Sequence, residues 1–342
     1  MQNEITQKTP LLNPDGSLNK PGWCRRNLFE YNRECISPSI MRLKEWDFYQ
    51  ISNGSKMVQI NFFNISLASC ATFGYVDLKT GEKFDCMGLV LNTPHKYRLN
   101  LNGDKANYFT FQKGNTKLTF DIKDNGGSLL FEGKCNGKRL KAEFFIEKLP
   151  EHESITIATP FDKQGHIFYT NKINCMKTKG VVKVGNRSID FSDKDTFTVL
   201  DWGRGIWPYS NMWYWANGST YIDGKPFGFE LTWGFGNTEK ATETALFYDG
   251  KCHKLGEVYL VDDPETNSNW MKPWHFKDKE GRLDLIMTPF YDNYSNMMPL
   301  NIFGMKTHQV HGLFNGTAML DDGTVLEIKD MYAFCEKVCN KW

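Results

Sequence analysis

The densest group of chemically useful side chains lies just past the middle of the chain, in Asp201-Trp-Gly-Arg-Gly-Ile-Trp-Pro-Tyr209 and the Trp-rich stretch after it. Asp201 paired with Arg204 would be a carboxylate held ionised, or else an acid tuned by burial. The alternative interpretation is an aromatic corner of the core, closed by a buried salt bridge. Because binding pockets combine aromatic side chains with a few convergent polar groups, the segment is a candidate site.

The tryptophans of this segment can line a cavity. Side chains alternate along a strand, so Trp213 and Trp215 share one face. Gly203 and Gly205 permit a positive φ or a close backbone approach beside Arg204. The expected ligand-binding side chains are Arg204, Trp207, Tyr209, Trp213, Trp215, Trp233 and Gln309.

Two further polar residues share a face with apolar ones. Glu243 would share a strand face with Phe247. If that face is interior, burial would raise the pKa of Glu243 and suit it to general acid catalysis. His308 has the parity of Val310, and Gln309 faces the other way. A lone histidine on an apolar face is more often a satisfied core residue than a catalyst. The candidate catalytic groups are Asp201, Glu243 and His308.

The sequence predicts neither a metal nor an organic cofactor. The phosphate-binding, zinc-protease and nucleophile-elbow motifs do not occur in it. His308 and His311 fall on opposite faces of a strand, and Cys335 and Cys339 have no second pair at zinc spacing.

Composition restricts the partners. Forty-one basic and 40 acidic residues leave a net charge of +1, which gives no general attraction to nucleic acid. The sequence has no run of 18 or more apolar residues, the length that a membrane-spanning helix needs. The nine cysteines are scattered and the first residues do not read as a signal peptide, so we expect reduced thiols in the cytoplasm.

The elements that must position these residues are short strands. Segments with period-2 alternation, separated by turns such as SNG, KTGEK and KDNGG, predict an all-β fold. No apolar stripe with helical period is sustained, so we expect few short helices, one of them at Ser192–Thr196. The aromatic content of 14% also favours strands.

The length of 342 residues predicts two domains at about 150 residues each. We expect an N-terminal arm over 1–35, anchored by Trp23 and Phe29, then β domains over 36–160 and 161–342. The boundary is placed where LPEHES and PFDKQG interrupt the strand pattern. Each domain is expected to be an antiparallel β-barrel or half-barrel.

Several longer motifs carry a family resemblance. They are GSLNKPGWCRRNL, KEWDFY, TNKINCM, DWGRGIWPY, TETALFYDG, MKPW and HQVHGLFNG. Through them the chain resembles the domain-of-unknown-function 2804 family and, more distantly, the AttH and hydroxyneurosporene synthase (carotenoid hydratase) group. The resemblance implies two tandem lipocalin-like barrels with a ligand cavity, and hydration or cyclisation of isoprenoid-like substrates. That chemistry needs a proton donor and an aromatic wall to stabilise a carbocation.

Three functions remain open at this point. The first is a cofactor-independent lyase, hydratase or isomerase that acts on a small hydrophobic molecule, with Asp201 or Glu243 as the general acid. The second is a carrier of an apolar ligand, in which Arg204 binds a carboxylate group of the ligand. The third is carbohydrate binding or cleavage, because tryptophan platforms beside carboxylates also suit sugars.

Overall fold

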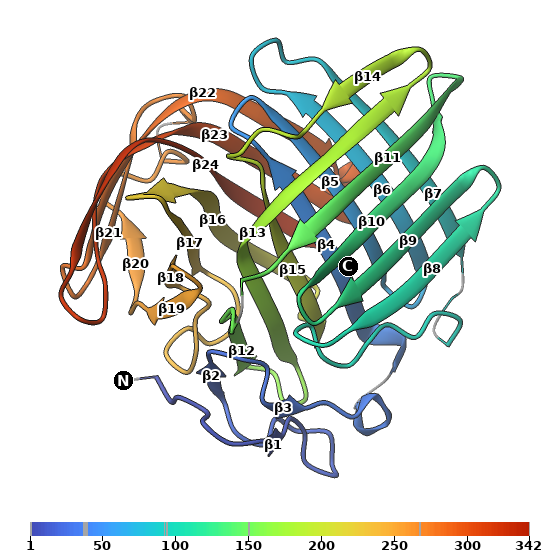
Figure 1. The fold of residues 1–342 in the computed structure, drawn as a ribbon. Coiled ribbons are helices and arrows are strands. Elements are labelled where there is room, and N and C mark those ends of the chain that lie inside the picture. The colour runs from blue at the N-terminus through green and yellow to red at the C-terminus, as the bar shows by residue number, and fades with distance from the viewer. Residues whose placement is uncertain are drawn as a thin grey trace.

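The protein, seen in a computed structural model, consists almost entirely of antiparallel strands arranged in two large curved sheets (Figure 1). The structure describes residues 2–36, 40–91, 93, 95–149, 151–266 and 268–341. The expected all-β class with two barrel-like halves is confirmed. Ser192–Thr196 forms no helix, and the short helices present are 3-10 turns at Arg33–Cys35 (η1), Ile40–Arg42 (η2) and Pro299–Asn301 (η3).

The first sheet has 13 strands and curls until β7 contacts β8, β9 and β10, which gives a nearly closed barrel. Its strands are β2 (Gly22–Cys24), β4 (Leu43–Ser52), β5 (Lys56–Asn64), β6 (Ala68–Asp77), β7 (Lys83–Leu91), β8 (Asn107–Lys113), β9 (Thr116–Lys123), β10 (Gly126–Cys135), β11 (Lys138–Glu147), β12 (Ile155–Pro160), β13 (Ile167–Val184), β14 (Arg187–Asp190) and β15 (Phe197–Ile206).

The second sheet has nine strands and forms a half-barrel. Its strands are β16 (Ser210–Ile222), β17 (Lys225–Trp233), β18 (Ala245–Tyr248), β19 (Lys251–Lys254), β20 (Val258–Leu260), β21 (Trp274–Asp278), β22 (Leu283–Met297), β23 (Gly304–Met319) and β24 (Val325–Lys341). The N-terminal arm adds the two-stranded β1 (Thr9–Pro10) and β3 (Phe29–Glu30). Trp23 and Phe29, its expected anchors, are buried.

The chain changes sheets between Ile206 and Ser210, whereas the sequence predicts a domain boundary at 160/161. β12 to β15 stay in the first sheet because β13 pairs with β11 and β15, and β15 pairs with β4. A break in the strand pattern marks a loop, but the pairing of distant strands decides which sheet a segment joins.

Side-chain alternation contributes to four apolar clusters among the described residues: one inside each curved sheet, one between the two sheets, and a small one at β5 and β6. The cluster between the sheets joins Ile157 and Phe168 of the first sheet to Ala245 and Phe247 of the second. β13 pairs with β15 in the middle of the molecule, and β13 also contacts β16 and β17 of the second sheet (Figure 1). Side chains on the outer face of the first sheet therefore meet side chains of the second.

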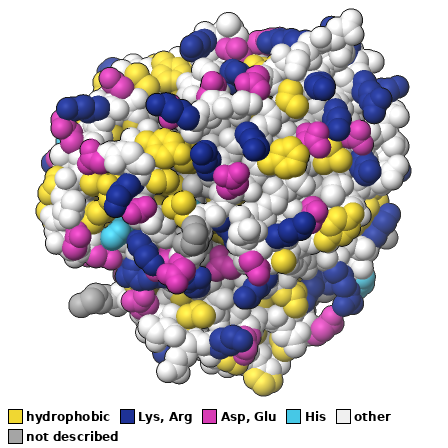
Figure 2. Space-filling view, viewed as in Figure 1, with side chains coloured by type: hydrophobic (Ala, Val, Ile, Leu, Met, Phe, Trp, Pro, Cys, Tyr) yellow, Lys and Arg dark blue, Asp and Glu magenta, His cyan; other side chains and the backbone are white. Residues whose placement is uncertain are grey.

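The surface is a mixture of both charge signs. On the face in Figure 2, basic and acidic side chains alternate without a continuous basic stripe. Across the part of the chain that the structure describes, no helix has the length and apolar character needed to cross a membrane.

Candidate functional site

Asp201 and Arg204 do not pair with each other. They lie three residues apart on β15, so their side chains leave the strand on opposite faces. The Arg204 Nη2 atom lies 2.9 Å from Asp47 Oδ1 inside the first barrel, while Asp201 Oδ1 lies 3.0 Å from Lys172 Nζ between the sheets. The expected pair is wrong, and Asp201 has a different cation.

The two glycines beside Arg204 serve close approach rather than a positive φ. Neither Gly203 nor Gly205 is among the residues with positive φ. A Cβ atom at Gly203 would overlap the indole ring of Trp46, and one at Gly205 would meet the Trp207 ring. The glycines thus let aromatic side chains lie flat against β15.

Lys172 is the centre of the polar group between the sheets. It lies directly across from Asp201 in the β13–β15 pair, so both side chains leave on the same face. Its Nζ atom also lies 3.7 Å from Glu243 Oε1 and 4.0 Å from the centroid of the Trp215 ring. The Lys172 residue is only 4% exposed.

Two more carboxyls from the second sheet face this lysine. Glu230 accepts hydrogen bonds from Trp215 Nε1 at 2.5 Å and Asn217 Nδ2 at 2.7 Å. Glu336 accepts one from Gln309 Nε2 at 3.1 Å. We call Lys172, Asp201, Glu230, Glu243 and Glu336 the carboxyl cluster.

Burial governs the titration of the cluster. It raises the pKa of Glu230 to about 8 and that of Glu336 to about 7, and Lys172 opposes both shifts. Burial also raises the pKa of Glu243, again against the attraction of Lys172. Burial alone would lower the pKa of Lys172, but Asp201, Glu243 and Glu230 together raise it.

One ammonium therefore shares a buried site with four carboxyls. Such a site cannot hold all four as anions, because only one positive charge compensates them. Protons remain in the cluster at neutral pH, on groups whose pKa values lie near 7 and 8. This arrangement suits transfer of protons to and from a bound molecule.

A Glu230→Gln variant tests the buried acid. The folded-state pKa of about 8 exceeds the ordinary 4.5, so folding takes up a proton between those pH values and Glu230 costs stability as pH rises. We expect the loss of unfolding free energy between about pH 5 and about pH 8 to shrink in the variant by about 3–4 kcal/mol.

Urea denaturation followed by tryptophan fluorescence at both pH values measures this slope. A Glu143→Gln variant, at a half-exposed side chain on β11, is the control and should keep the wild-type slope. An unchanged slope in Glu230→Gln would contradict a raised pKa.

Part of the expected site comes together in the cluster. Asp201 and Glu243 contact Lys172, and Trp215 packs on it. Gln309 bonds to Glu336, and a hydrogen bond from Trp213 lowers the pKa of the same carboxyl. Trp213 and Trp215 face the first sheet together, as their spacing predicts.

The other expected residues lie elsewhere. Arg204 points into the first barrel, and Trp233 stacks on Tyr214 inside the second sheet, with centroids 4.8 Å apart. Tyr209 is exposed and donates to the Ile302 carbonyl. Trp207 packs edge-on against Trp46 in the apolar layer between the sheets.

His308 also leaves β23 on the face opposite Gln309. Its Nδ1 lies 2.7 Å from Asp292 Oδ2, and its ring stacks on Trp270 with centroids 4.0 Å apart. The structure therefore places His308 in a group separate from the carboxyl cluster.

The sequence reasoning missed Lys172, Glu230 and Glu336. A signal was present for two of them, because Lys172 and Glu230 each interrupt a run of otherwise uncharged strand residues, TNKINCM and PFGFELTW. A charged residue in such a run is buried with a partner or marks a functional site. No local pattern distinguishes Glu336, which lies among other charged residues of β24.

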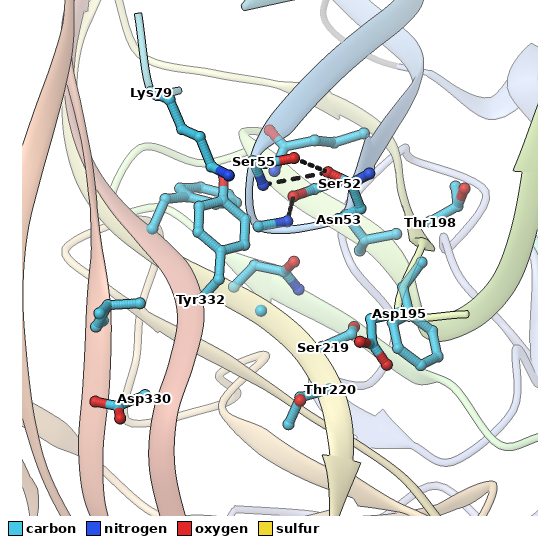
Figure 3. A pocket seen from close by; sticks show the side chains of 18 residues that line it. Ser52, Asn53, Ser55, Lys79, Asp195, Thr198, Ser219, Thr220, Asp330 and Tyr332 are labelled. Carbon is cyan, nitrogen blue, oxygen red and sulfur yellow. Dashed lines mark hydrogen bonds between the residues drawn. The ribbon is translucent and has the colours of Figure 1, made fainter. Parts of the chain in front are cut away.

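A pocket with a volume of about 370 Å³ opens between the sheets beside the cluster (Figure 3). It is lined by Gln50, Ser52, Asn53, Gly54, Ser55, Lys79, Asp195, Phe197, Thr198, Val199, Asn217, Gly218, Ser219, Thr220, Leu313, Asp330, Tyr332 and Phe334. The tryptophans expected at a cavity are not among them. Asn217 touches the cluster directly, through its hydrogen bond to Glu230.

The described residues offer no group of three or more His, Cys, Asp or Glu side chains arranged to hold a metal ion. The residues of the candidate site are instead a lysine, carboxyls, amides and aromatic rings. These groups can bind a small molecule and move protons.

Comparison with known proteins gives one family and one fold. The family described as a domain of unknown function (DUF2804) matches residues 2–342. The crystal structure of kievitone hydratase from Nectria haematococca is similar over 98% of this chain and 99% of that chain, with a TM-score of 0.50 and 12% sequence identity. At so low a sequence identity, the structural similarity shows a shared fold alone. No curated protein matches the sequence significantly.

Proposed function

The chain belongs to the DUF2804 family, and from the chemistry of its carboxyl cluster we propose that it is a cofactor-independent acid–base enzyme that adds water to, or removes water from, a small hydrophobic molecule. The observation that carries the proposal is the group of four carboxyls around Lys172, two of them buried and two part-buried, with pKa values raised to about 8 at Glu230 and about 7 at Glu336. Groups with such pKa values can donate and regain a proton near neutral pH.

The cluster contains partners for both proton transfers. In a hydration, a protonated carboxyl such as Glu230 or Glu243 gives its proton to one alkene carbon. Water adds to the other carbon and loses a proton to a carboxylate, for which Asp201 beside Lys172 is the candidate. Dehydration runs the same steps backwards, and the substrate gains or loses one water in total.

The aromatic side chains around the cluster suit the cationic character of that reaction. Trp215 already packs on the Lys172 ammonium, and its ring meets Phe48 and Phe334 edge-on. Aromatic faces attract positive charge in a site that excludes water. That kievitone hydratase is named a hydratase agrees with the proposed reaction class, and its substrate is not transferred to this chain.

Incubation with heavy-oxygen water tests the proposed reaction. We would incubate the protein with a small-molecule extract in H₂¹⁸O and search by mass spectrometry for compounds that gain or lose one water. An Asp201→Asn variant should lose at least about a hundredfold of this turnover, the usual contribution of a positioned proton acceptor.

The Asp249→Asn variant is the matched control. Asp249 lies in the β18–β19 turn, half-exposed and paired with Lys225, so its change should leave turnover unaffected. Equal activity of Asp201→Asn and wild type would exclude Asp201. If no compound exchanges water with the wild-type protein, the hydratase proposal fails.

A non-catalytic binding protein is the second candidate, favoured by the pocket beside the cluster. Native mass spectrometry of protein purified from its own host would identify a retained ligand. A carrier would keep that ligand unchanged in both wild type and Asp201→Asn, whereas an enzyme would convert it only in the wild type.

A further inference from the structure

Two amide side chains form the inner end of the pocket. Gln50 on β4 is 3% exposed and Asn217 on β16 is 4% exposed, and both line the cavity. They come from different sheets, so the pocket closes on them from both sides. We call Gln50 and Asn217 the floor amides.

A chain of glutamines fixes which end of Gln50 faces the pocket. Gln309 Nε2 donates to Glu336 at 3.1 Å, and Gln59 Nε2 donates to Gln309 Oε1 at 3.2 Å. Gln59 Nε2 also donates to Gln50 Oε1 at 2.9 Å. In this chain each Nε2 donor meets an oxygen acceptor, so the amide orientations are mutually consistent. The oxygen of Gln50 is used, and its Nε2 donor has no partner among the described residues.

Asn217 has the opposite orientation. Its Nδ2 donates to Glu230 Oε1 at 2.7 Å and to the Phe229 carbonyl at 3.2 Å. The backbone carbonyl can only accept, so this orientation does not depend on the protonation of Glu230. The Oδ1 acceptor of Asn217 has no partner within the part of the chain that is described.

The other lining residues indicate which parts of a ligand are apolar and which can be charged. The buried side chains Phe197, Val199 and Phe334 give apolar wall near the floor amides. The charged lining residues Lys79, Asp195 and Asp330 are all exposed, and Figure 3 shows them on different sides of the pocket. Neither Gln50 Nε2 nor Asn217 Oδ1 is among the fully buried side-chain atoms that lack a partner in the described residues, so both atoms are open to the pocket, where a ligand can replace water as their partner.

We infer that the pocket binds an uncharged molecule with an apolar frame and a hydrogen-bond acceptor next to a donor, as in a carboxamide or a hydroxyl beside a carbonyl. The acceptor takes the hydrogen bond of Gln50 Nε2, and the donor binds Asn217 Oδ1. This inference goes beyond the proposed function, because it concerns the pocket, and none of the five side chains of the carboxyl cluster lines that pocket. A carboxylic acid is disfavoured, because as an anion it has no donor for Asn217.

Benzamide is a direct probe of this pattern, and benzoate is its charged counterpart without a donor. Saturation-transfer NMR on the full-length protein should show benzamide bound in the millimolar range and benzoate at least about tenfold more weakly, as expected for a lost hydrogen bond in a buried site. Equal binding of the two probes, or no binding of benzamide, would overturn the inference.

Variants locate the binding. Gln50→Glu replaces the donor by an acceptor and should weaken benzamide about tenfold or more, and Gln50→Met should do the same without adding charge. Gln112→Glu makes the same change on an exposed residue of β8 and should leave binding unaffected. Circular dichroism melting confirms that each variant is folded, and unchanged benzamide binding in both Gln50 variants would refute the inference.

The outcome separates this inference from the proposed function. Asp201→Asn should lose turnover but retain benzamide, because Asp201 does not line the pocket. Selective benzamide binding without any turnover would refute the enzyme and leave the ligand class intact. Turnover without selective binding at Gln50 would refute the ligand class and leave the enzyme.

Discussion

A Lys172→Met variant is expected to lose about 3–5 kcal/mol of unfolding free energy at pH 8. Lys172 is the only cation in contact with Asp201 and Glu243 among the described residues. Methionine has a similar length and no charge, so the variant leaves buried carboxylates without compensation. Removing one partner of a buried ion pair costs far more than the pair contributes, because the remaining charge stays desolvated.

The loss should shrink as the pH falls to about 5. Lys172 holds the pKa values of Glu230, Glu243 and Glu336 down against burial, so all three rise further in the variant. A carboxyl with a raised folded-state pKa costs stability as pH rises and recovers it when protonated. The penalty is therefore largest above neutral pH.

Urea unfolding at the two pH values measures both effects. Lys225→Met removes a lysine whose ion pair with Asp249, 2.8 Å long, is half-exposed. That control should lose less than about 1 kcal/mol. Similar losses in the two variants would show that the cluster does not depend on its lysine.

An Arg204→Met variant is expected to lose a comparable amount, about 3–5 kcal/mol, inside the first barrel. The guanidinium contacts Asp47 at 2.9 Å and donates to the carbonyls of Trp46 and Asn100 at 2.7 and 2.9 Å. It also packs over the Trp202 ring at 4.0 Å. Without it Asp47, 1% exposed, loses its cation, and four further acceptors, three backbone carbonyls and the Asn100 side-chain oxygen, each lose a hydrogen bond.

This loss should also grow with pH. Burial raises the pKa of Asp47 and Arg204 opposes the shift, so the pKa rises further in the variant. The control is Arg187→Met, because Arg187 pairs with Glu82 at 2.6 Å with both side chains about half-exposed. We expect less than about 1 kcal/mol from it in the same urea experiment. A loss below 1 kcal/mol in Arg204→Met would mean that Asp47 is not held by this arginine.

The two variants distinguish two buried groups of charged side chains, and the DWGR segment contributes one residue to each group. Asp201 of the DWGR segment belongs to the carboxyl cluster between the sheets, and Arg204 belongs to the barrel interior with Asp47 and Glu45. Only the first group adjoins the pocket, through Glu230 and Asn217. Asp201→Asn is therefore expected to lose turnover with little loss of stability, because Lys172 keeps Glu243 as a partner, whereas Arg204→Met leaves Asp47 without a cation.

The sequence alone determined the features that depend on residues close together in the chain, namely the strands, the turns and the face on which a side chain lies. The period-2 pattern and the turn motifs predicted antiparallel strands, and the strand parity placed Trp213 and Trp215 on one face and separated His308 from Gln309. These features are local because alternation along one strand fixes which side chains share a face. Alternation does not account for Glu243, which lies ahead of β18 and is buried together with both of its neighbours in the chain.

Only the tertiary structure decided what covers each face. Alternation along β15 predicts that the side chains of Asp201 and Arg204 leave the strand on opposite faces. It does not predict that Asp201 meets Lys172 and that Arg204 meets Asp47. Lys172, Glu230 and Glu336 converge because β13, β17 and β24, far apart in sequence, meet where the outer face of one sheet packs on the other. Strand pairing and sheet packing are long-range choices, since a strand's own residues fix its faces but do not name the strand or sheet that it joins.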